Sequence, residues 1–441
     1  MSISKGIKYR LMRDYGAPAL MSLQNLKKRK PRPIPEAFGP PLKSNQRLKE
    51  ILSRHYFLAR YVPGVKKVAW VTSGAPVELL RAFDFYTIYP ENHSALIGAK
   101  KQGAEFCGIA ESNGFSQDLC SYARIDLGHM LSGKTPAGKL PKPDLLFCSN
   151  NICQTVLYWY KAIAFELDIP LIHFDAPFVT TKQTTADVNY MAQQLQDMIP
   201  VLERVSGRVF YPSDLETILK RSMESSQTWG AILETMQAKP APMTIFDAFG
   251  HLAPIVSLRG LPVAQDYYHI LLEEVQSRVS QGIGAISDER YRLIWDNIAI
   301  WYKVRFLATF FAERKMNFVT ATYTNAWAET TGYLDVKNPW TSMAKTYGQI
   351  ILNNNLKHRL ELMKQMIHDY SVDGMVMHST RSCKPYSVGQ FDLRKALNAD
   401  LDLPAVILDA DIADERVWSE QQIQTRLEAF CETLEDQSHA I

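Results

Sequence analysis

Short apolar runs recur along the chain, and each gives way to a polar turn and then to a segment with helical periodicity. The first of these runs are Val68–Thr72, Pro143–Cys148 and Ile169–Asp175. Uninterrupted apolar runs of about four to eight residues are typical of strands that are buried on both faces. Because strands that alternate with helices form parallel sheets, these runs predict a first α/β domain over residues 64–195.

A second series of short runs predicts another sheet of the same kind. The runs are Arg292–Trp295, Phe318–Thr320, Gly374–His378 and Ala405–Asp409. Helical patterns lie between them, which again favours parallel strands covered by helices. We expect this second α/β domain over residues 243–441.

Helical sequence precedes the first predicted sheet and separates it from the second. Residues 1–63 are basic and rich in proline before a helical pattern at Asn45–Tyr61, and we interpret them as an N-terminal arm. The helical pattern that begins at Ala186 predicts a helical connection over residues 196–242, which ends in the prolines of Lys239–Pro242. The expected fold class is α/β, with two Rossmann-like, doubly wound parallel-sheet domains, a helical N-terminal arm and a helical connection.

The composition is that of a folded globular protein. Hydrophobic residues make up 46% of the 441 residues and charged residues 22%, a balance far from that of a disordered chain. The formal net charge of +3 is small for this length, so we expect no nucleic-acid partner. We interpret the basic segment Leu26–Arg32 as a strap that lies on a neighbouring subunit.

The sequence offers no apolar run long enough for a signal peptide or a membrane span. Met1–Arg13 lacks the apolar core of a leader, and nowhere do about 18 uncharged apolar residues follow one another. We therefore expect a cytoplasmic protein without a membrane partner. Six cysteines in such a chain argue against a disulfide framework, because cytosolic thiols stay reduced.

Residues suited to binding or catalysis gather just after the predicted strands. Ser73, Ser149–Cys153, Asp175 and His378–Cys383 each follow the end of a predicted strand. In doubly wound sheets, ligands bind beyond the carboxyl ends of the strands. We expect the active site in a cleft between the two domains. The sequence contains neither a glycine-rich dinucleotide fingerprint nor a P-loop pattern, so nucleotide binding by this chain is not expected.

Three of the cysteines occupy predicted junctions between a loop and a helix. They are Cys120, Cys153 and Cys383. A helix N-terminus favours a thiolate there. Their spacing alone leaves other interpretations open, because three unrelated buried thiols or a zinc site would also explain it, and no local Cys-x-x-Cys pair occurs.

The remaining cysteines have less distinctive surroundings. Cys107 and Cys431 fall in apolar or helical segments, and we interpret them as small core residues. Cys148 ends a predicted strand five residues before Cys153, so it is either a core residue or a neighbour of the same site.

The residues around the junction cysteines form blocks that are typical of a known superfamily. The blocks are Leu119–Tyr122, Cys148–Cys153 and His378–Ser387, together with Tyr89–His93, Arg292–Trp295, Asp409–Asp411 and Gln424–Phe430. Through them, from about Trp70 to Leu434, the chain resembles the 2-hydroxyacyl-CoA dehydratase and benzoyl-CoA reductase superfamily. The block around Cys383 most resembles the B-type catalytic subunit of ATP-dependent, class I benzoyl-CoA reductases.

This resemblance implies a cofactor and a set of partners. It implies one 4Fe-4S cluster held by Cys120, Cys153 and Cys383. It further implies a second catalytic subunit of similar fold, a dimeric ATPase activator with a bridging 4Fe-4S cluster, and ferredoxin as the upstream electron donor. The implied reaction is the dearomatisation of benzoyl-CoA to a cyclohexadiene-carbonyl-CoA, in which low-potential electron transfer is coupled to protonation.

Further site residues are hypotheses from their positions near predicted strand ends. We interpret His93 as the proton donor and Glu91 as its orienting partner, although a structural role is as common for such residues. Ser73 and its turn are candidates for hydrogen-bond donors to the thioester carbonyl. Arg381 and Lys384 are candidates for binding the coenzyme A phosphates.

Rival functions remain open at the level of the sequence. A 2-hydroxyacyl-CoA dehydratase of the same superfamily would use the same cluster ligands while recycling its electron. A homodimeric double-cubane protein of the superfamily is another enzyme that fits. A non-catalytic iron-sulfur subunit that only relays electrons, and a zinc-binding structural protein, are the alternatives from other classes.

Overall fold

Two parallel sheets form the centre of the molecule. The computed structural model describes residues 3–26, 34–136, 140–328 and 331–439. The first sheet contains β1 (Val68–Val71), β2 (Tyr86–Ile88), β3 (Leu145–Ser149) and β4 (Leu171–Phe174), in the spatial order β2-β1-β3-β4. All of its neighbouring strands are parallel, as predicted.

The second sheet repeats the topology of the first. It contains β5 (Tyr291–Asp296), β6 (Met316–Ala321), β7 (Gly374–Thr380) and β8 (Ala405–Ala410), in the order β6-β5-β7-β8. In both sheets the earliest strand is central, the next lies at its outer side, and the last two extend the other side, which is the Rossmann-like arrangement. The expected α/β fold class with two parallel sheets is confirmed.

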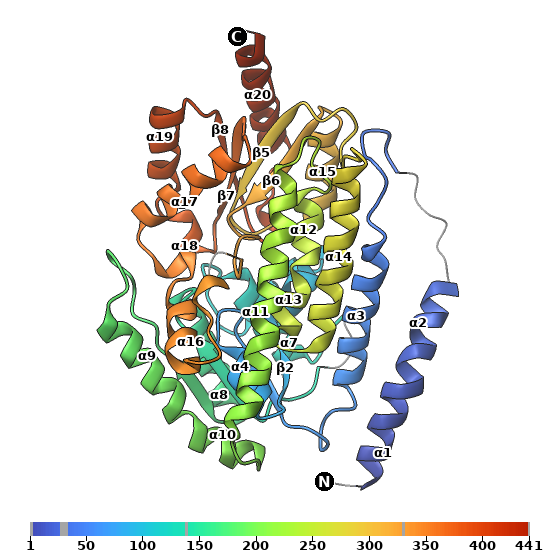
Figure 1. Cartoon of the computed structure of the whole chain (residues 1–441), viewed down its shortest axis with the longest axis vertical. Coiled ribbons are helices and arrows are strands. Elements are labelled where there is room, and N and C mark those ends of the chain that lie inside the picture. Colours follow the sequence, from blue (N-terminus) through green and yellow to red (C-terminus); the bar gives the residue numbers. More distant parts are fainter. Residues whose placement is uncertain (1–2, 27–33, 137–139, 329–330, 440–441) are drawn as a thin grey trace.

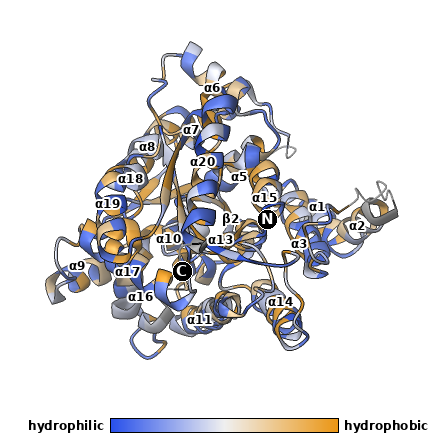
Figure 2. Cartoon of the chain, turned by 90° about the horizontal axis from the view of Figure 1, so that it is seen from above, coloured by the Kyte–Doolittle hydropathy of each residue, from blue (hydrophilic) through white to orange (hydrophobic). Residues whose placement is uncertain are grey.

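Helices cover both faces of each sheet. The helices around the first sheet are α4 (Val77–Ala82), α5 (Pro90–Ala99), α6 (Gly103–Ser112), α7 (Ser121–Ser132) and α8 (Gln154–Leu167). The helices around the second sheet are α15 (Val304–Ala312), α17 (Leu356–Asp369), α19 (Gln390–Leu401) and α20 (Glu420–His439). In the view from above, hydrophobic strands lie between helices whose outer residues are more hydrophilic (Figure 2). This distribution follows from burying both faces of a parallel sheet.

A layer of long helices runs alongside both sheets. Its members are α3 (Ser44–Ala59), α11 (Pro212–Glu234) and α14 (Pro262–Ser280), and α14 packs against the other two (Figure 1). The predicted helical stretch after Ala186 is present as α9 (Thr185–Asp197), α10 (Ile199–Ser206) and α11. The expected boundaries of the arm, the two domains and the connection stay predictions. Residues 27–32 of the expected basic strap lie outside the described residues.

One hydrophobic core joins the two sheets. Val71 and Phe147 of the first sheet and Trp295 and Phe318 of the second belong to the same buried cluster, which also includes Trp229 of α11. The sheets are therefore held in a fixed relation by shared packing, which positions residues from both sheets around one site. Among the described residues, no helix combines the length and the apolar character that a bilayer crossing requires.

The first sheet's helices also approach the segment after β8 very closely. A Cβ atom built on Gly103, at the start of α6, would lie 1.9 Å from the carbonyl oxygen of Ala413, and one built on Gly98 would lie 2.8 Å from the Ala413 Cβ. Only glycine permits this backbone approach. The contact fixes α6 against the loop that follows β8.

We predict that Gly103→Ala destabilises the protein by about 1–3 kcal/mol, because the added methyl overpacks a contact with backbone that cannot yield. Gly108→Ala in the same helix is the control, since a Cβ there meets no atom within 4 Å. It should be neutral or stabilise by up to ~1 kcal/mol through helix propensity. Urea unfolding of both variants measures the difference in stability. Equal unfolding midpoints for the two variants would contradict the close approach of Gly103 to the Ala413 carbonyl.

Candidate active site

Three cysteines from distant parts of the sequence line one internal cavity. Cys120, Cys153 and Cys383 immediately precede α7, α8 and α18 (Lys384–Ser387), so each stands at a helix N-terminus, as the sequence predicted. All three line the same cavity of about 800 Å³. The fold thus brings together the three cysteines that the family resemblance selected.

Burial makes these thiols poor acids in the absence of a cation. It raises the pKa of Cys153 to about 11 and that of Cys383 to about 12, and each of these thiols also feels the charge of a neighbouring group. Burial likewise raises the pKa of Cys120, which the other two thiols raise further. A bound metal group would reverse this penalty, because coordination stabilises the thiolate.

Backbone N–H groups favour the thiolates from the protein side. The amides of Ala123, Val156 and Tyr386 each lie three residues after one of the cysteines and lower its pKa. None of the three sulfurs completes a capping hydrogen bond to its helix. The sulfurs are therefore oriented by their helices and still available for coordination.

The three thiols do not meet at a site for a single metal ion. Among the described residues, no three histidine, cysteine, aspartate or glutamate side chains converge closely enough to hold one metal ion. In a cluster each thiolate binds a different iron atom, so the cysteines surround the group instead of meeting at a point. A structural zinc ion needs four ligands at one centre, which this arrangement does not provide.

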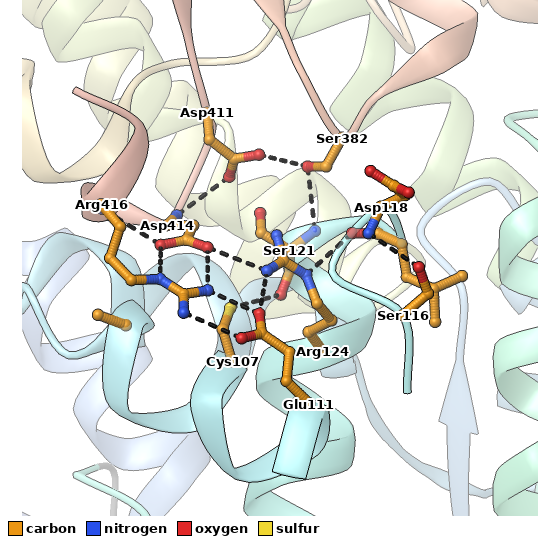
Figure 3. A network of polar contacts seen from close by, with 12 residues as sticks. Cys107, Glu111, Ser116, Asp118, Ser121, Arg124, Ser382, Asp411, Asp414 and Arg416 are labelled. Carbon is orange, nitrogen blue, oxygen red and sulfur yellow. Dashed lines mark hydrogen bonds and ion pairs between the residues drawn. The ribbon is translucent and has the colours of Figure 1, made fainter. Parts of the chain in front are cut away.

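A short hydrogen-bonded bridge joins two of the cysteine loops (Figure 3). The N–H of Ser121, the residue after Cys120, donates to the Ser382 Oγ at 3.1 Å. The Ser382 hydroxyl in turn donates to a carboxylate oxygen of Asp411, after β8. Because Ser382 directly precedes Cys383, this bridge fixes the distance between Cys120 and Cys383 across the two sheets.

Buried ion pairs reinforce the bridge from below (Figure 3). Arg124 of α7 donates from Nη1 to Glu111 at 2.6 Å and to Asp414 at 3.0 Å. Arg416 pairs with the same two carboxylates at 2.7 and 2.6 Å. With both partners of Arg124 in place its charge is compensated, so α7 is held against the segment after β8.

Glu91 and Ser73 form a second polar element of the cavity lining. The Ser73 N–H donates to the Glu91 Oε2 at 2.5 Å. Burial raises the pKa of Glu91 to about 7, and the hydrogen bonds from Ser73 offset part of that rise. Both residues line the cavity with the cysteines. The Ser73 N–H is thus engaged by Glu91, whereas the sequence suggested that it contacts the thioester carbonyl.

His93 does not join this group. It is fully buried, its Nε2 lies 2.6 Å from the Thr135 Oγ1, and its ring packs edge-on against His129. Burial lowers the pKa of His93 to about 3, so the ring is neutral. Residues two apart on a helix project from nearly opposite sides, which is why Glu91 faces the cavity and His93 does not.

The two cations proposed for the coenzyme A phosphates also lie outside the cavity lining. Arg381 pairs with Asp409, with 3.2 Å between Nη2 and Oδ2, and 65% of its side chain is exposed. The Lys384 Nζ donates to the Arg381 carbonyl at 2.9 Å. Although both flank Cys383 in the sequence, neither belongs to the cavity lining.

The other cysteines are packed in the core. Cys148 is buried in β3, and it is absent from the cavity lining. Cys107 packs in α6, and the Cys431 sulfur contacts the Met316 sulfur at 3.7 Å. Their surroundings suit the structural role expected of free, buried cysteines.

Sequence reasoning missed an aromatic wall on the cavity, which consists of Tyr122, Phe249, Trp301 and Tyr323. The Trp301 Nε1 donates to the Tyr122 hydroxyl. The Phe249 ring lies 6.2 Å from that of Trp301 and 6.1 Å from that of Tyr323. These residues come from four separate elements, and no local motif distinguishes cavity aromatics from core aromatics.

Comparison with known families identifies the family of the chain. The family model of the 2-hydroxyglutaryl-CoA dehydratase D-component matches residues 72–434. The match includes Ser73, Glu91 and all three cavity cysteines. The chain belongs to this family. The description of the family as a dehydratase component accords with the superfamily resemblance of the sequence.

Individual relatives of the D-component family refine this assignment. The alpha subunit of (R)-2-hydroxyisocaproyl-CoA dehydratase from Clostridioides difficile is 34% identical, over 84% of this chain and 91% of its own length. The alpha subunit of (R)-phenyllactyl-CoA dehydratase from Clostridium sporogenes is 33% identical, over 84% and 90%. The B subunit of benzoyl-CoA reductase from Thauera aromatica is 28% identical, over 84% and 89%. The expectation that the chain is closest to the reductase is therefore wrong.

We predict that Ser382→Ala weakens the bridge between the cysteine loops. The change removes the hydroxyl that the Asp411 Oδ2 and the Ser121 N–H share, which costs about 1–3 kcal/mol, although the Asp411 Oδ1 keeps the N–H groups of Ala413 and Asp414. Ser280→Ala is the control, because its exposed hydroxyl only contacts a helix carbonyl and should matter by less than about 0.5 kcal/mol. Urea midpoints of chelator-treated protein compare the two, and an unchanged Ser382→Ala midpoint would contradict the bridge.

Proposed function

We propose that this chain is the cluster-carrying catalytic subunit of a 2-hydroxyacyl-CoA dehydratase. The observation that carries the proposal is the joint exposure to one cavity of three helix-terminal thiols and of a carboxyl whose pKa is about 7. Both dehydratase alpha subunits named above support it, since they match this chain over 84% of its length.

Cys120, Cys153 and Cys383 are the residues that would hold a 4Fe-4S cluster. Such a group supplies one-electron transfer at low potential, which burial and thiolate ligation favour. The Cys120 and Cys153 thiolates are stabilised by the N-termini of α7 and α8. A cluster held by three protein thiolates would have one iron open to a further ligand, and Glu91 lines the same cavity as the three cysteines.

The substrate would enter the cavity between α3 and α5. Arg60 at the end of α3 and Lys100 at the end of α5 line this side of the cavity, and both are exposed. Leu48 and Leu52 of α3 also line the cavity. Exposed cations together with apolar walls suit the phosphates and the apolar arm of coenzyme A, so we assign Arg60 and Lys100 to the role first considered for Arg381 and Lys384.

Glu91 would move the protons of the dehydration. In its protonated form it donates a proton to the C2 hydroxyl as the carbon–oxygen bond breaks, so that the hydroxyl leaves as water. The resulting carboxylate accepts a proton from C3, which restores the acid and leaves a 2-enoyl-CoA. The electron that activates the thioester is returned at the end, so the reaction is redox-neutral. A pKa near 7 suits both roles.

The proposal includes the partners that the family resemblance implied. They are a second catalytic subunit of similar fold, a dimeric ATPase activator with a bridging 4Fe-4S cluster, and ferredoxin as the upstream donor, all in the cytoplasm. The relatives are named as subunits, which supports a hetero-oligomer.

Reduction of benzoyl-CoA is the second candidate function, favoured by the aromatic wall and by the benzoyl-CoA reductase relative from Thauera aromatica. The reconstituted complex distinguishes the two. A dehydratase converts an (R)-2-hydroxyacyl-CoA to its enoyl-CoA with far fewer electrons than turnovers, whereas a reductase consumes two electrons for each benzoyl-CoA. We expect dehydration with few electrons consumed. Consumption of two electrons for each benzoyl-CoA would instead support the reductase function.

We predict that Cys120→Ser, Cys153→Ser and Cys383→Ser each lose most of their iron on anaerobic purification, because a serine oxygen is a poorer ligand for iron in a cluster. Cys431→Ser is the matched control, since this buried thiol lies in α20 away from the cavity. It should keep the iron and sulfide of the wild type. Iron retained in all three cavity variants would remove the cluster assignment.

We predict that kcat/KM for dehydration falls about tenfold per pH unit above pH ~7, because the protonated form of Glu91 is then lost. Glu91→Gln should lower turnover by about 10²–10⁴-fold and abolish the fall of kcat/KM above pH ~7, while the iron content stays unchanged. Asp126→Asn is the control: burial also raises the pKa of Asp126 to about 7, but Asp126 does not line the cavity. If Asp126→Asn abolishes the fall of kcat/KM at high pH and Glu91→Gln retains it, Glu91 is not the acid that donates the proton.

A further inference from the structure

The aromatic wall belongs to the part of the cavity that the cysteines and Glu91 line, which we call its inner end. The Tyr122 hydroxyl is within electrostatic range of the Cys120 thiol, the Glu91 carboxyl and the Tyr323 hydroxyl. The Tyr323 hydroxyl is also within range of Glu91. Phe249 completes the wall by packing against the rings of Trp301 and Tyr323. A group that reacts next to Glu91 therefore has this wall as its neighbour.

The wall is held rigidly by its surroundings. Tyr122 is fixed by the hydrogen bond from Trp301, and the Trp301 backbone N–H donates to the Ile412 carbonyl at 3.1 Å. Phe249 is almost fully buried in α12 (Ile245–His251), where Phe246 packs against it from the core side. Rigid aromatic surfaces favour apolar ligands that match their shape, because little side-chain freedom is lost on binding.

The charges of the cavity are arranged unevenly. Among the described residues that line it, the cations are Arg60 and Lys100, and both are exposed at the α3 and α5 side. Lys100 also donates to the Pro136 carbonyl at 3.0 Å. The one lining carboxyl, Glu91, lies at the inner end. The inner end therefore offers no positive charge to an anionic acyl tail.

Buried cations behind the lining are already engaged. Arg359, 5.0 Å from the ring centre of the lining residue Tyr386, pairs with Asp296 at 2.7 Å. Arg81 donates to the Ser257 carbonyl at 2.7 Å.

The Arg259 guanidinium lies 5.7 Å from the ring centre of Tyr347, which lines the cavity. Its Nε donates to the Glu78 Oε1 at 2.9 Å and its Nη2 to the Tyr347 hydroxyl at 2.6 Å. A carboxylate at the inner end would lose its water without gaining an ion pair, which is strongly unfavourable.

From this arrangement we propose that the acyl group accepted by this chain is bulky and apolar, with a branched aliphatic or an aromatic end, and that acyl groups with a second carboxylate are excluded. Phe249 and Trp301 are the residues that determine this specificity. The inference rests on the proposed function for the reacting thioester, and it goes further by naming the class of acyl group.

The first test compares turnover by the reconstituted holoenzyme complex. The substrates are the CoA thioesters of (R)-2-hydroxy-4-methylpentanoate, (R)-2-hydroxy-3-phenylpropanoate, (R)-2-hydroxypropanoate and (R)-2-hydroxyglutarate. Since one methylene in an apolar pocket changes kcat/KM by roughly 10–200-fold, the first two should exceed the short substrate by at least ~10²-fold. The dicarboxylic substrate should be the poorest. Equal or better turnover of 2-hydroxyglutaryl-CoA overturns the inference and leaves the proposed dehydratase function intact.

A binding measurement separates the two proposals if turnover fails. Calorimetry of the iron-loaded protein uses the unreactive thioesters 4-methylpentanoyl-CoA, 3-phenylpropanoyl-CoA, propanoyl-CoA and glutaryl-CoA. Tighter binding of the first two without any dehydration would reject the proposed function and support the acyl class. Tighter binding of glutaryl-CoA or propanoyl-CoA would reject the acyl class whatever the reaction.

Variants locate the specificity on the wall. Phe249→Ala should reduce the ratio of kcat/KM between the 4-methylpentanoyl and propanoyl 2-hydroxy substrates by about tenfold or more, because the bulky end loses its contact surface. Trp301→Phe, a milder change, should reduce the same ratio to a smaller extent. Phe246→Ala is the matched control: it removes an aromatic ring from the same helix on the core side, outside the cavity lining. It should leave the ratio unchanged even if it lowers stability, and a ratio that Phe249→Ala also leaves unchanged would overturn the assignment.

Discussion

The bridge from Ser121 through Ser382 to Asp411 is the interaction on which the site depends. It links the residue after one cavity cysteine to the residue before another, although 261 positions separate the two serines in the sequence. The glycines of α5 and α6 allow the loop after β8 to approach closely enough for this bridge to form. Arg124 then compensates the buried charge beside it. Without this convergence, the cysteines of the two sheets would belong to separate surfaces.

The same convergence places charged, reactive and aromatic residues in different parts of the cavity lining. Glu91, Cys153 and Cys383 follow the ends of β2, β3 and β7, which is where doubly wound sheets bind ligands, and Cys120 joins them from the N-terminus of α7. The lining cations are exposed at the ends of α3 and α5, whereas the aromatic wall lies beside the cysteines and Glu91. A CoA thioester has its charges at one end and its reacting acyl group at the other, so the polarity of the cavity matches the polarity of that ligand. Membership of the dehydratase D-component family accords with this match.

The sequence predicted those features that depend on local pattern. Long apolar runs such as Leu145–Ser149 identified buried strands, whereas β2 is only Tyr86–Ile88 and was too short to stand out. The helix junctions at Cys120 and Cys153 were evident from the sequence, but only the family resemblance selected these cysteines together with Cys383. Local reasoning paired Glu91 with His93 as neighbours in sequence, while helical geometry turns them to opposite sides. The aromatic wall depends on contacts between four distant elements, which no single sequence can reveal.

The most direct measurement is anomalous X-ray diffraction from anaerobically grown crystals, recorded on both sides of the iron absorption edge. The account predicts a single iron peak enclosed by the sulfur atoms of Cys120, Cys153 and Cys383, on the wall of the cavity that Glu91 also lines. An iron peak at another place, or crystals of active protein in which the three thiols enclose no iron, would contradict it.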